Sequence, residues 1–208
     1  MTSILVVCTG NICRSPIAEG LLRDALTGRF GADAPMVSSA GTWGVEGSPA
    51  THEAVAAAAE RGTDIAAHRA RRLSAVKVAD ADLVIAMAGE HRLALESDDA
   101  VAGRTFTLKE LVRLLESLRS PDPGALPGSL AHRVSEAAAA RRAGFTGNRL
   151  DEDVADPLGL ALQSYRAIAW ELDEWVDRVV DGLYGAEPIR AVNEAEHRHR
   201  SRGADRHG

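Results

Sequence analysis

Cysteine is almost absent from this sequence, and aromatic residues are scarce. Two of its 208 residues are cysteine, Cys8 and Cys13, and they lie five positions apart. A disulfide between them would close a very short loop, which contributes little stability by the loop-entropy argument. We therefore interpret both as reactive thiols rather than as a structural disulfide.

Long apolar runs and an excess of basic charge are also lacking. No segment approaches the roughly 18 apolar residues of a transmembrane helix, and the run at residues 4–8 is too short for a signal peptide. A net charge of −6 argues against a generally basic nucleic-acid binder. The sequence thus predicts a cytoplasmic protein whose partners include neither nucleic acid nor membrane.

The remaining composition is that of a globular protein, with 45% hydrophobic and 26% charged residues. We expect a single domain over residues 1–185, because one core suffices at this length. Several prolines and glycines between 119 and 131 indicate an insertion at about 119–150. Residues 186–208 are polar, rich in Arg and His and without apolar period, so we expect a disordered tail.

Short apolar segments alternate with helical patterns along the chain. Four segments predict strands, at residues 4–7, 36–39, 82–87 and 104–106. Predicted helices begin at Ser15-Pro16, at Ser48-Pro49, at Thr107, near residue 131 and near Leu158. This alternation is typical of an α/β fold with a doubly wound parallel sheet.

The first strand leads into a loop with the features of an anion cradle. Cys8 ends the strand, and five residues separate it from Arg14 and from the helix start at Ser15. Backbone N–H groups and the helix N-terminus favour a bound oxyanion, and Gly10 lets it approach closely. The Arg14 guanidinium can hold two phosphate oxygens. We expect the same field to favour the thiolate of Cys8, so the loop predicts phosphoryl transfer to sulfur.

The alternative for this loop is a small buried cysteine followed by a surface arginine. The agreement of strand, loop and helix start opposes it. Residues 7–16, Val-Cys-Thr-Gly-Asn-Ile-Cys-Arg-Ser-Pro, closely resemble the signature of the low-molecular-weight protein tyrosine phosphatases, a family that also includes related arsenate reductases. The resemblance is strong over residues 4–28, looser over 39–42, 62–73 and 83–87, and returns at 156–157.

The resemblance implies a flavodoxin-like sheet of four parallel strands with helices on both faces. It also implies a cysteinyl-phosphate intermediate on Cys8, with no metal or other cofactor. Asp156 matches the general acid that protonates a departing tyrosine oxygen. An Asp before Pro157 is also a good helix cap, and both interpretations can hold together. Asp151 and Asp153 are expected to be solvated loop charges.

The remaining site residues are assigned by the same resemblance. Those expected to bind substrate or its phosphate are Thr9, Gly10, Asn11, Ile12, Cys13, Ser15 and Trp43. Asn11 and Ser15 are also expected to hold the shape of the loop, with Ser39 and His68 as supporting partners.

Two of these residues have open alternatives. Cys13 either forms a reversible disulfide with Cys8 under oxidation or is a small residue packing the loop. Trp43 either stacks against an aromatic substrate or plugs its loop onto the core.

The sequence departs from its family in two places, after Asp156-Pro157 and in the insertion, and it also carries a separate run of arginines. No aromatic residue follows Asp156-Pro157, where the chain has Leu158-Gly159-Leu160, and this weakens the inference to phosphotyrosine. The segment Arg69-Ala-Arg71-Arg72 is expected to be a solvated surface. The insertion carries arginines that we expect on an exposed basic helix face, namely Arg133, Arg141, Arg142 and Arg149.

The sequence therefore predicts a cysteine-dependent phosphatase acting on phosphate monoesters, with protein phosphotyrosine or a small phosphate ester as substrate. One alternative is a single-cysteine arsenate reductase using a small external thiol, since no cysteine follows Cys13 to relay a disulfide. A non-catalytic phosphate-binding module is a second alternative. It needs neither a nucleophile nor an acid, so the presence of Cys8, Arg14 and Asp156 together opposes it.

Overall fold

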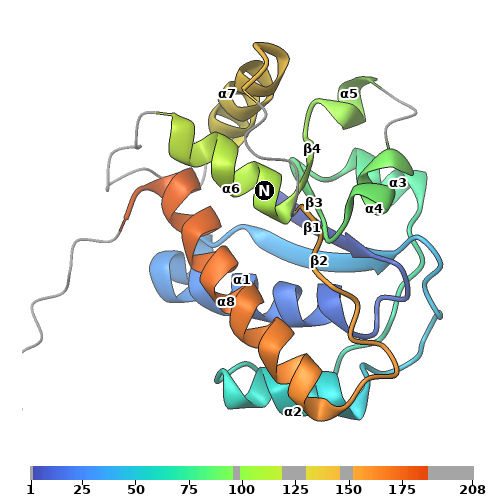
Figure 1. Cartoon of the computed structure of the whole chain (residues 1–208). Helices are drawn as coiled ribbons and strands as arrows, with labels where there is room; N and C mark the ends of the chain where they lie inside the picture. Colours follow the sequence, from blue (N-terminus) through green and yellow to red (C-terminus); the bar gives the residue numbers. More distant parts are fainter. Residues whose placement is uncertain (1, 96–98, 119–129, 146–151, 187–208) are drawn as a thin grey trace, which may run out of the picture.

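A four-stranded parallel sheet forms the centre of the molecule (Figure 1). The computed structural model describes residues 2–95, 99–118, 130–145 and 152–186. The strands are β1 (Ser3–Cys8), β2 (Met36–Gly41), β3 (Leu83–Ala86) and β4 (Thr105–Thr107). Their order is β2-β1-β3-β4, and all three pairings are parallel. The predicted doubly wound parallel sheet is confirmed.

Helices cover both faces of this sheet. The long helices are α1 (Arg14–Phe30), α2 (His52–Glu60), α6 (Leu108–Ser117), α7 (Leu130–Arg142) and α8 (Leu162–Tyr184). Short helices lie at α3 (Ala75–Ala79), α4 (Gly89–Leu93), α5 (Asp99–Ala102) and the 3-10 turn η1 (Gly31–Asp33). Ile4, Val6 and Ile85 point into the larger core, which contains residues of all five long helices. Leu5, Val7 and Val84 point to a smaller core that includes Val78 of α3.

The helix beginnings differ from prediction where a different residue satisfies the free backbone N–H groups. We predicted the second helix from Ser48, but α2 begins at His52, because the Thr51 side chain accepts from the backbone N of Ala54 at 3.2 Å. The last helix begins at Leu162 rather than near Leu158, after Gly159 has taken a positive φ of 80°. The short helices α3 to α5 span too few residues to show a helical period.

Helix α7 belongs to the predicted insertion and packs into the main core through Leu130, Val134 and Ala137. The expectation of an exposed basic face is wrong for two of its arginines. Arg133 is 4% exposed and donates to the carbonyl of Gly182 from Nε at 3.1 Å and from Nη2 at 2.8 Å. A backbone carbonyl of another helix thus accepts hydrogen bonds from a side chain that the sequence pattern places in solvent.

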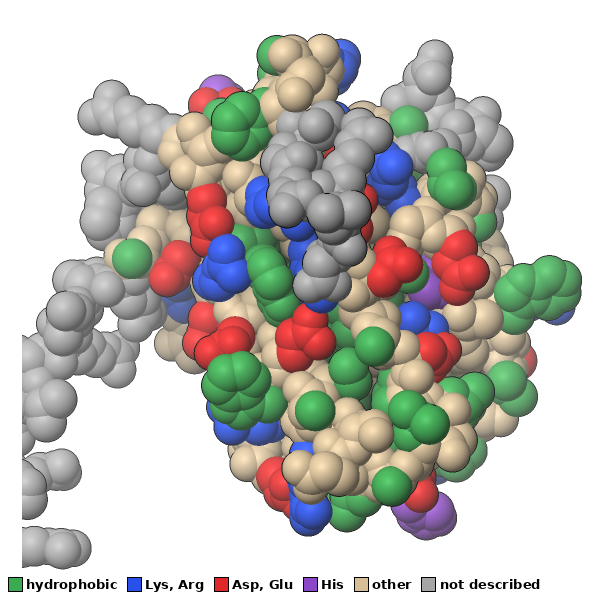
Figure 2. Space-filling model, in the orientation of Figure 1, with side chains coloured by type: hydrophobic (Ala, Val, Ile, Leu, Met, Phe, Trp, Pro, Cys, Tyr) green, Lys and Arg blue, Asp and Glu red, His purple; other side chains and the backbone are tan. Residues whose placement is uncertain are grey.

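Arg141 is partly buried and donates to the carbonyls of Ala102 and Thr105, whereas Arg142 is exposed. The described residues do not include 119–129 and 146–151, which contain Arg149 and the rest of the predicted insertion. They also do not include the predicted tail from residue 187. Within the described ranges, no helix is long and apolar enough to cross a membrane. Figure 2 shows acidic, basic and hydrophobic side chains interspersed over the face in view.

Candidate active site

The candidate site lies where successive strands change from one side of β1 to the other in the order of the sheet. From β1 the chain first adds β2 on one side and then β3 on the other. The carboxyl end of β1 is therefore the switch point at which open α/β sheets bind ligands. The loop at residues 8–14 occupies this end, flanked by the loops that follow β2 and β3.

The loop closes around the sulfur of Cys8, which is 2% exposed. The backbone N of Asn11 donates to Sγ at 3.3 Å, and Ser15 Oγ lies 2.9 Å from Sγ. We predicted a helix start at Ser15 and a role for its hydroxyl in holding the loop; α1 begins one residue earlier, at Arg14, and the Ser15 hydroxyl faces the sulfur. The sulfur therefore has two polar neighbours that can stabilise a negative charge.

Asn11 fixes the shape of the loop. Its φ of 57° is left-handed, a conformation that asparagine tolerates better than most residues. The side chain is fully buried, and Nδ2 donates to Ser15 Oγ at 2.9 Å and to Ser39 Oγ at 2.7 Å. Its Oδ1 accepts from the backbone N of Arg71 at 2.7 Å. The structure thus brings the predicted residues Asn11, Ser15 and Ser39 into one cluster.

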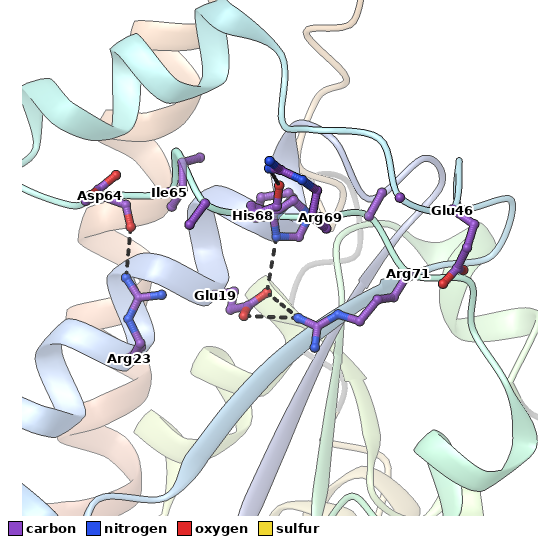
Figure 3. A pocket seen from close by; sticks show the side chains of 12 residues that line it. Glu19, Arg23, Glu46, Asp64, Ile65, His68, Arg69 and Arg71 are labelled. Carbon is purple, nitrogen blue, oxygen red and sulfur yellow. Dashed lines mark hydrogen bonds and ion pairs between the residues drawn. The ribbon is translucent and has the colours of Figure 1, made fainter.

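Glu19 of α1 connects this cluster to His68 and Arg71 (Figure 3). Ser39 Oγ donates to Glu19 Oε2, and Arg71 Nη2 lies 3.3 Å from Glu19 Oε1. His68 Nε2 lies 2.8 Å from the carbonyl oxygen of Asn11, to which it donates, and Nδ1 lies 3.8 Å from Glu19 Oε2. Burial lowers the pKa of His68. We call Asn11, Ser15, Ser39, Glu19, His68 and Arg71 the loop-shaping cluster.

The outer side of the loop-shaping cluster faces a pocket of about 550 Å³. Glu19, His68 and Arg71 line it, together with Arg23 and Asp64 (Figure 3). The expectation of a solvated arginine run at residues 69–72 is therefore wrong for Arg71, whose backbone and side chain both join the cluster.

Arg14 lies on the opposite side of the loop with its side chain 5% exposed. Nη2 donates to Asp156 Oδ2 at 2.6 Å and to Thr9 Oγ1 at 3.3 Å, and Nη1 donates to the carbonyl of Val154 at 3.1 Å. Its buried Nε has no partner among the described residues. Arg14 and Asp156, the predicted oxyanion holder and the predicted acid, are thus in direct contact.

The segment that presents Asp156 is tied to the end of β3. Val154 N donates to the carbonyl of Met87 at 2.8 Å, and Asp153 Oδ1 accepts from Gly89 N at 2.7 Å. Asp153 is exposed in a loop, as expected of a solvated charge, and in addition accepts this hydrogen bond, whereas Asp151 lies outside the described residues. Asp156 Oδ1 accepts from Leu158 N at 3.1 Å, and the side chain is 44% exposed, so the carboxylate is accessible to a substrate.

His91 of α4 also belongs to this side, and the sequence analysis missed it. It is 1% exposed, and its Nε2 lies 2.9 Å from Thr9 Oγ1. Burial, and next the charge of Arg14, lower the pKa of His91. We call Arg14, Thr9, His91, Val154 and Asp156 the arginine-holding group. A polar residue just after the strand beside the loop is the signal that could have found His91.

Cys13 and Ile12 lie on the inner side of the loop. Cys13 is buried, with Sγ 3.6 Å from the Tyr165 hydroxyl and 3.8 Å from Thr51 Oγ1. Burial raises the pKa of Cys13. Both cysteines are free thiols, and Ile12 packs against the main core. A redox role for Cys13 remains a prediction.

Trp43 stands at the rim of the loop. Its ring is 73% exposed and lies 5.8 Å from the guanidinium of Arg72. Its backbone N donates to the carbonyl of Thr9 at 2.9 Å, and Val45 N donates to that of Gly10 at 3.3 Å. The alternative of a tryptophan plugged onto the core is therefore wrong, and the ring is free to contact a substrate.

Comparisons with known proteins identify the family of this chain. The chain matches the family described as "Low molecular weight phosphotyrosine protein phosphatase" over residues 3–137. It is 41% identical over 122 residues to the low molecular weight protein-tyrosine-phosphatase Etp of Escherichia coli (strain K12), covering 58% of this chain and 76% of Etp. It is 32% identical over 182 residues to a protein-arginine-phosphatase of Geobacillus stearothermophilus, covering 86% and 95%.

Solved structures agree with the sequence relatives. The crystal structure of a low molecular weight protein tyrosine phosphatase from T. tengcongensis aligns with a TM-score of 0.65 at 32% identity, covering 88% of this chain and 100% of that one. The YwlE arginine phosphatase from Geobacillus stearothermophilus aligns at 0.63 and 29%, covering 95% and 97%. This chain therefore belongs to the low molecular weight phosphotyrosine protein phosphatase family and is a cysteine-dependent phosphatase.

Proposed function

We propose that Cys8, Arg14 and Asp156 catalyse the hydrolysis of a phosphorylated protein side chain in two steps. The observation behind this proposal is the arrangement around one loop. The sulfur of Cys8 lies at its base with Asn11 N at 3.3 Å and Ser15 Oγ at 2.9 Å, and Arg14 and Asp156 meet 2.6 Å apart at its mouth.

In the first step, the Cys8 thiolate attacks phosphorus while the bond from phosphorus to the leaving oxygen breaks. Arg14 and the loop N–H groups hold the three equatorial oxygens, over which the charge of the transition state spreads. Asp156 gives its proton to the departing oxygen, so the products are a cysteinyl phosphate and a neutral hydroxyl.

In the second step, the Asp156 carboxylate takes a proton from a water molecule as that water attacks the cysteinyl phosphate. The sulfur–phosphorus bond breaks, and its electron pair returns to Cys8 as thiolate. Inorganic phosphate leaves, and Asp156 is again protonated. Both steps use side chains of this chain alone, and we propose that no metal or other cofactor takes part, and that the enzyme acts in the cytoplasm.

For the substrate we propose protein phosphotyrosine. Trp43 is exposed at the rim, and Leu158 and Leu160 are each 55% exposed on the segment that follows Asp156. These apolar side chains supply the wall that an aromatic ring requires. Nucleic acids and membranes are not proposed as partners, in line with the net charge of −6.

Phosphoarginine in a protein is the second candidate. The relative named a protein-arginine-phosphatase aligns over 182 residues, and no aromatic residue follows Asp156-Pro157 in this chain. Its leaving nitrogen would take a proton from Asp156 in the same way. Arsenate reduction is less favoured, because the loop has an acid at its mouth that reduction by an external thiol does not require.

The test is hydrolysis of p-nitrophenyl phosphate at mildly acidic pH in the presence of EDTA. Cys8→Ser should lose turnover by at least about 10⁴-fold and remain folded, because the hydroxyl is a far weaker nucleophile. A fully active Cys8→Ser protein contradicts the mechanism. Absent turnover in the reduced wild type would favour the reductase, which consumes thiol only when arsenate is added.

The substrate is then decided with two peptides of one sequence, phosphorylated on tyrosine or on arginine. We expect the larger kcat/KM for the phosphotyrosyl peptide. Trp43→Ala should reduce this preference, and Trp170→Ala is the matched control, because Trp170 is 53% exposed on α8. A larger kcat/KM for the phosphoarginyl peptide would overturn the assignment and leave the chemistry intact.

A further inference from the structure

The buried histidine of α4 has no part in the mechanism described so far. His91 Nε2 lies 2.9 Å from Thr9 Oγ1, and the same oxygen lies 3.3 Å from Arg14 Nη2. The three side chains therefore form one continuous chain of contacts. It begins on a helix beyond β3 and ends at the guanidinium proposed to hold phosphate.

The chemistry of the three groups sets the direction of one of these hydrogen bonds, and the tautomer of His91 sets the other. An arginine only donates, so Thr9 Oγ1 accepts from Arg14. Because a hydroxyl oxygen can accept two hydrogen bonds, His91 Nε2 can donate to Thr9 Oγ1 or accept its hydrogen, and we assign it as the acceptor in a neutral ring with its hydrogen on Nδ1. A neutral ring also agrees with the lowered pKa of His91.

Four charged groups influence the pKa of this histidine. The Arg14 guanidinium opposes its protonation, whereas the carboxylates of Glu90, Asp153 and Asp156 favour it. Glu90 Oε1 lies 3.4 Å from His91 Nε2, but its side chain is 73% exposed and therefore well screened by solvent. Burial in the protein is the largest influence and keeps the ring neutral.

Arg14 has three acceptors, and two of them lie on one segment. Val154 and Asp156 both belong to the stretch before α8, and Asp156 must leave Arg14 to give its proton to a leaving group. An incoming phosphate also competes with Asp156 for the guanidinium. Thr9 is the acceptor that lies on the phosphate loop itself, so it can keep its contact while the others change.

We propose that His91, acting through Thr9, is a positioning residue that holds the Arg14 guanidinium in place for the phosphate when Asp156 releases it. The Thr9 hydroxyl, fixed by His91, accepts from Nη2 and leaves the unpartnered Nε of Arg14 directed at the oxyanion. This inference rests on the proposed role of Arg14 as the oxyanion holder.

The experiment measures the competitive inhibition constant of inorganic phosphate, together with kcat and KM for p-nitrophenyl phosphate. Thr9→Val removes the hydroxyl and keeps the shape, and His91→Leu removes the acceptor. Each should weaken phosphate inhibition about ten- to a hundredfold, the effect of one hydrogen bond to a charged group. The double variant should be no weaker than either single one, because both changes break the same chain.

Two conservative variants separate positioning from mere packing. Thr9→Ser keeps the hydroxyl, and His91→Gln keeps a polar atom that can accept it, so both should recover most of the affinity for phosphate. A lower thermal midpoint with an unchanged inhibition constant in Thr9→Val or His91→Leu would overturn the proposal. If His91→Leu does not fold, Thr9→Val decides, because it replaces a hydroxyl with a methyl group.

Arg14→Lys tells this proposal apart from the proposed function. If Arg14→Lys loses phosphate affinity while Thr9→Val and His91→Leu keep it, the positioning role is wrong and the function stands. If Arg14→Lys binds phosphate like the wild type, the role of Arg14 in the proposed function is wrong as well.

Discussion

The phosphate loop is held from two sides, and the two sides differ in how completely their polar groups are paired. In the loop-shaping cluster, both amide hydrogens and the carbonyl oxygen of the Asn11 side chain have partners. The Glu19 carboxylate accepts hydrogen bonds from Ser39 and Arg71. In the arginine-holding group, Arg14 Nε and His91 Nδ1 are buried without partners among the described residues, whereas the loop-shaping cluster has one such atom, Arg71 Nε, on a side chain that lines the outer pocket.

This difference matches what each side has to do. A loop whose N–H groups must point at phosphate before it arrives benefits from partners that never change. In the proposed mechanism, by contrast, the Arg14 guanidinium exchanges a carboxylate for a phosphate in each cycle. The contact of 2.6 Å between Arg14 and Asp156 is therefore a resting arrangement, made with the group that phosphate replaces. One side of the loop thus holds the loop conformation with fixed hydrogen bonds, and the other side makes contacts that can be exchanged.

The largest expected effect comes from removing the exchangeable partner. Asp156→Asn should lower kcat by about 10³-fold for phenyl phosphate, whose leaving oxygen needs a proton, and by far less for p-nitrophenyl phosphate. The same change should tighten inhibition by inorganic phosphate, because Arg14 loses a competing carboxylate. Steady-state kinetics with both esters and a phosphate titration measure these effects.

Equal losses with both leaving groups would remove Asp156 from the acid role. Weaker inhibition by phosphate would show that the contact between Arg14 and Asp156 helps phosphate rather than competing with it. Asp153→Asn is the matched control, because Asp153 binds Gly89 N on the same segment without contacting Arg14.

A smaller loss of activity, with a larger loss of stability, is expected from the other side. Asn11→Ala removes three hydrogen bonds, two buried and one partly buried, and places alanine, which tolerates the left-handed region less well than asparagine, at a φ of 57°. We expect a loss of about 2–4 kcal/mol in the free energy of unfolding and a fall in kcat/KM of about 10²-fold. Denaturant unfolding and steady-state kinetics give the two values.

Asn11→Gly separates the two causes, because glycine accepts the left-handed backbone without strain. It should be less destabilised than Asn11→Ala and equally slow. If Asn11→Ala unfolds like the wild type, the cluster does not hold the loop, and the comparison between the two sides fails.

The sequence revealed most about the part of the site that is continuous in the chain. A buried strand, a glycine-containing loop and a helix start lie within residues 4–16, so local rules were enough to predict the cradle around Cys8. The alternating pattern likewise predicted all four strands of the sheet. Asp156 came from family resemblance, because nothing local separates an acid at this position from a helix cap.

The missed residues depend on contacts between distant segments. Glu19 and Arg71 are charged residues of the kind usually found at the surface, and only the folded chain brings them to Asn11 and Ser39. His91 is 82 positions from its partner Thr9. Charged and polar residues are usually exposed, so a buried one cannot be recognised before its partner is known.

The smallest expected effect concerns pH, and it involves one histidine from each side. Burial lowers the pKa of both His68 and His91 in the folded protein. Below the ordinary histidine pKa of about 6.5, the unfolded chain therefore binds protons on these two residues. The folded chain binds them only at lower pH. The free energy of unfolding should be highest above that pH. It should fall as the pH drops towards the lower pKa values of the two histidines in the folded protein.

Denaturant unfolding between about pH 5.5 and 8, above the range in which ordinary carboxyl groups titrate, measures this slope. His68→Gln and His91→Gln should each flatten it, and the double variant should flatten it further, since the two rings lie on opposite sides of the loop. His132→Gln, with its side chain 76% exposed on α7, should leave the slope unchanged. A wild-type protein that gains stability as the pH falls through this window would mean that one of the two rings is charged in the folded state. The neutral acceptor assigned to His91 would then be wrong if His91→Gln, and not His68→Gln, abolished that gain.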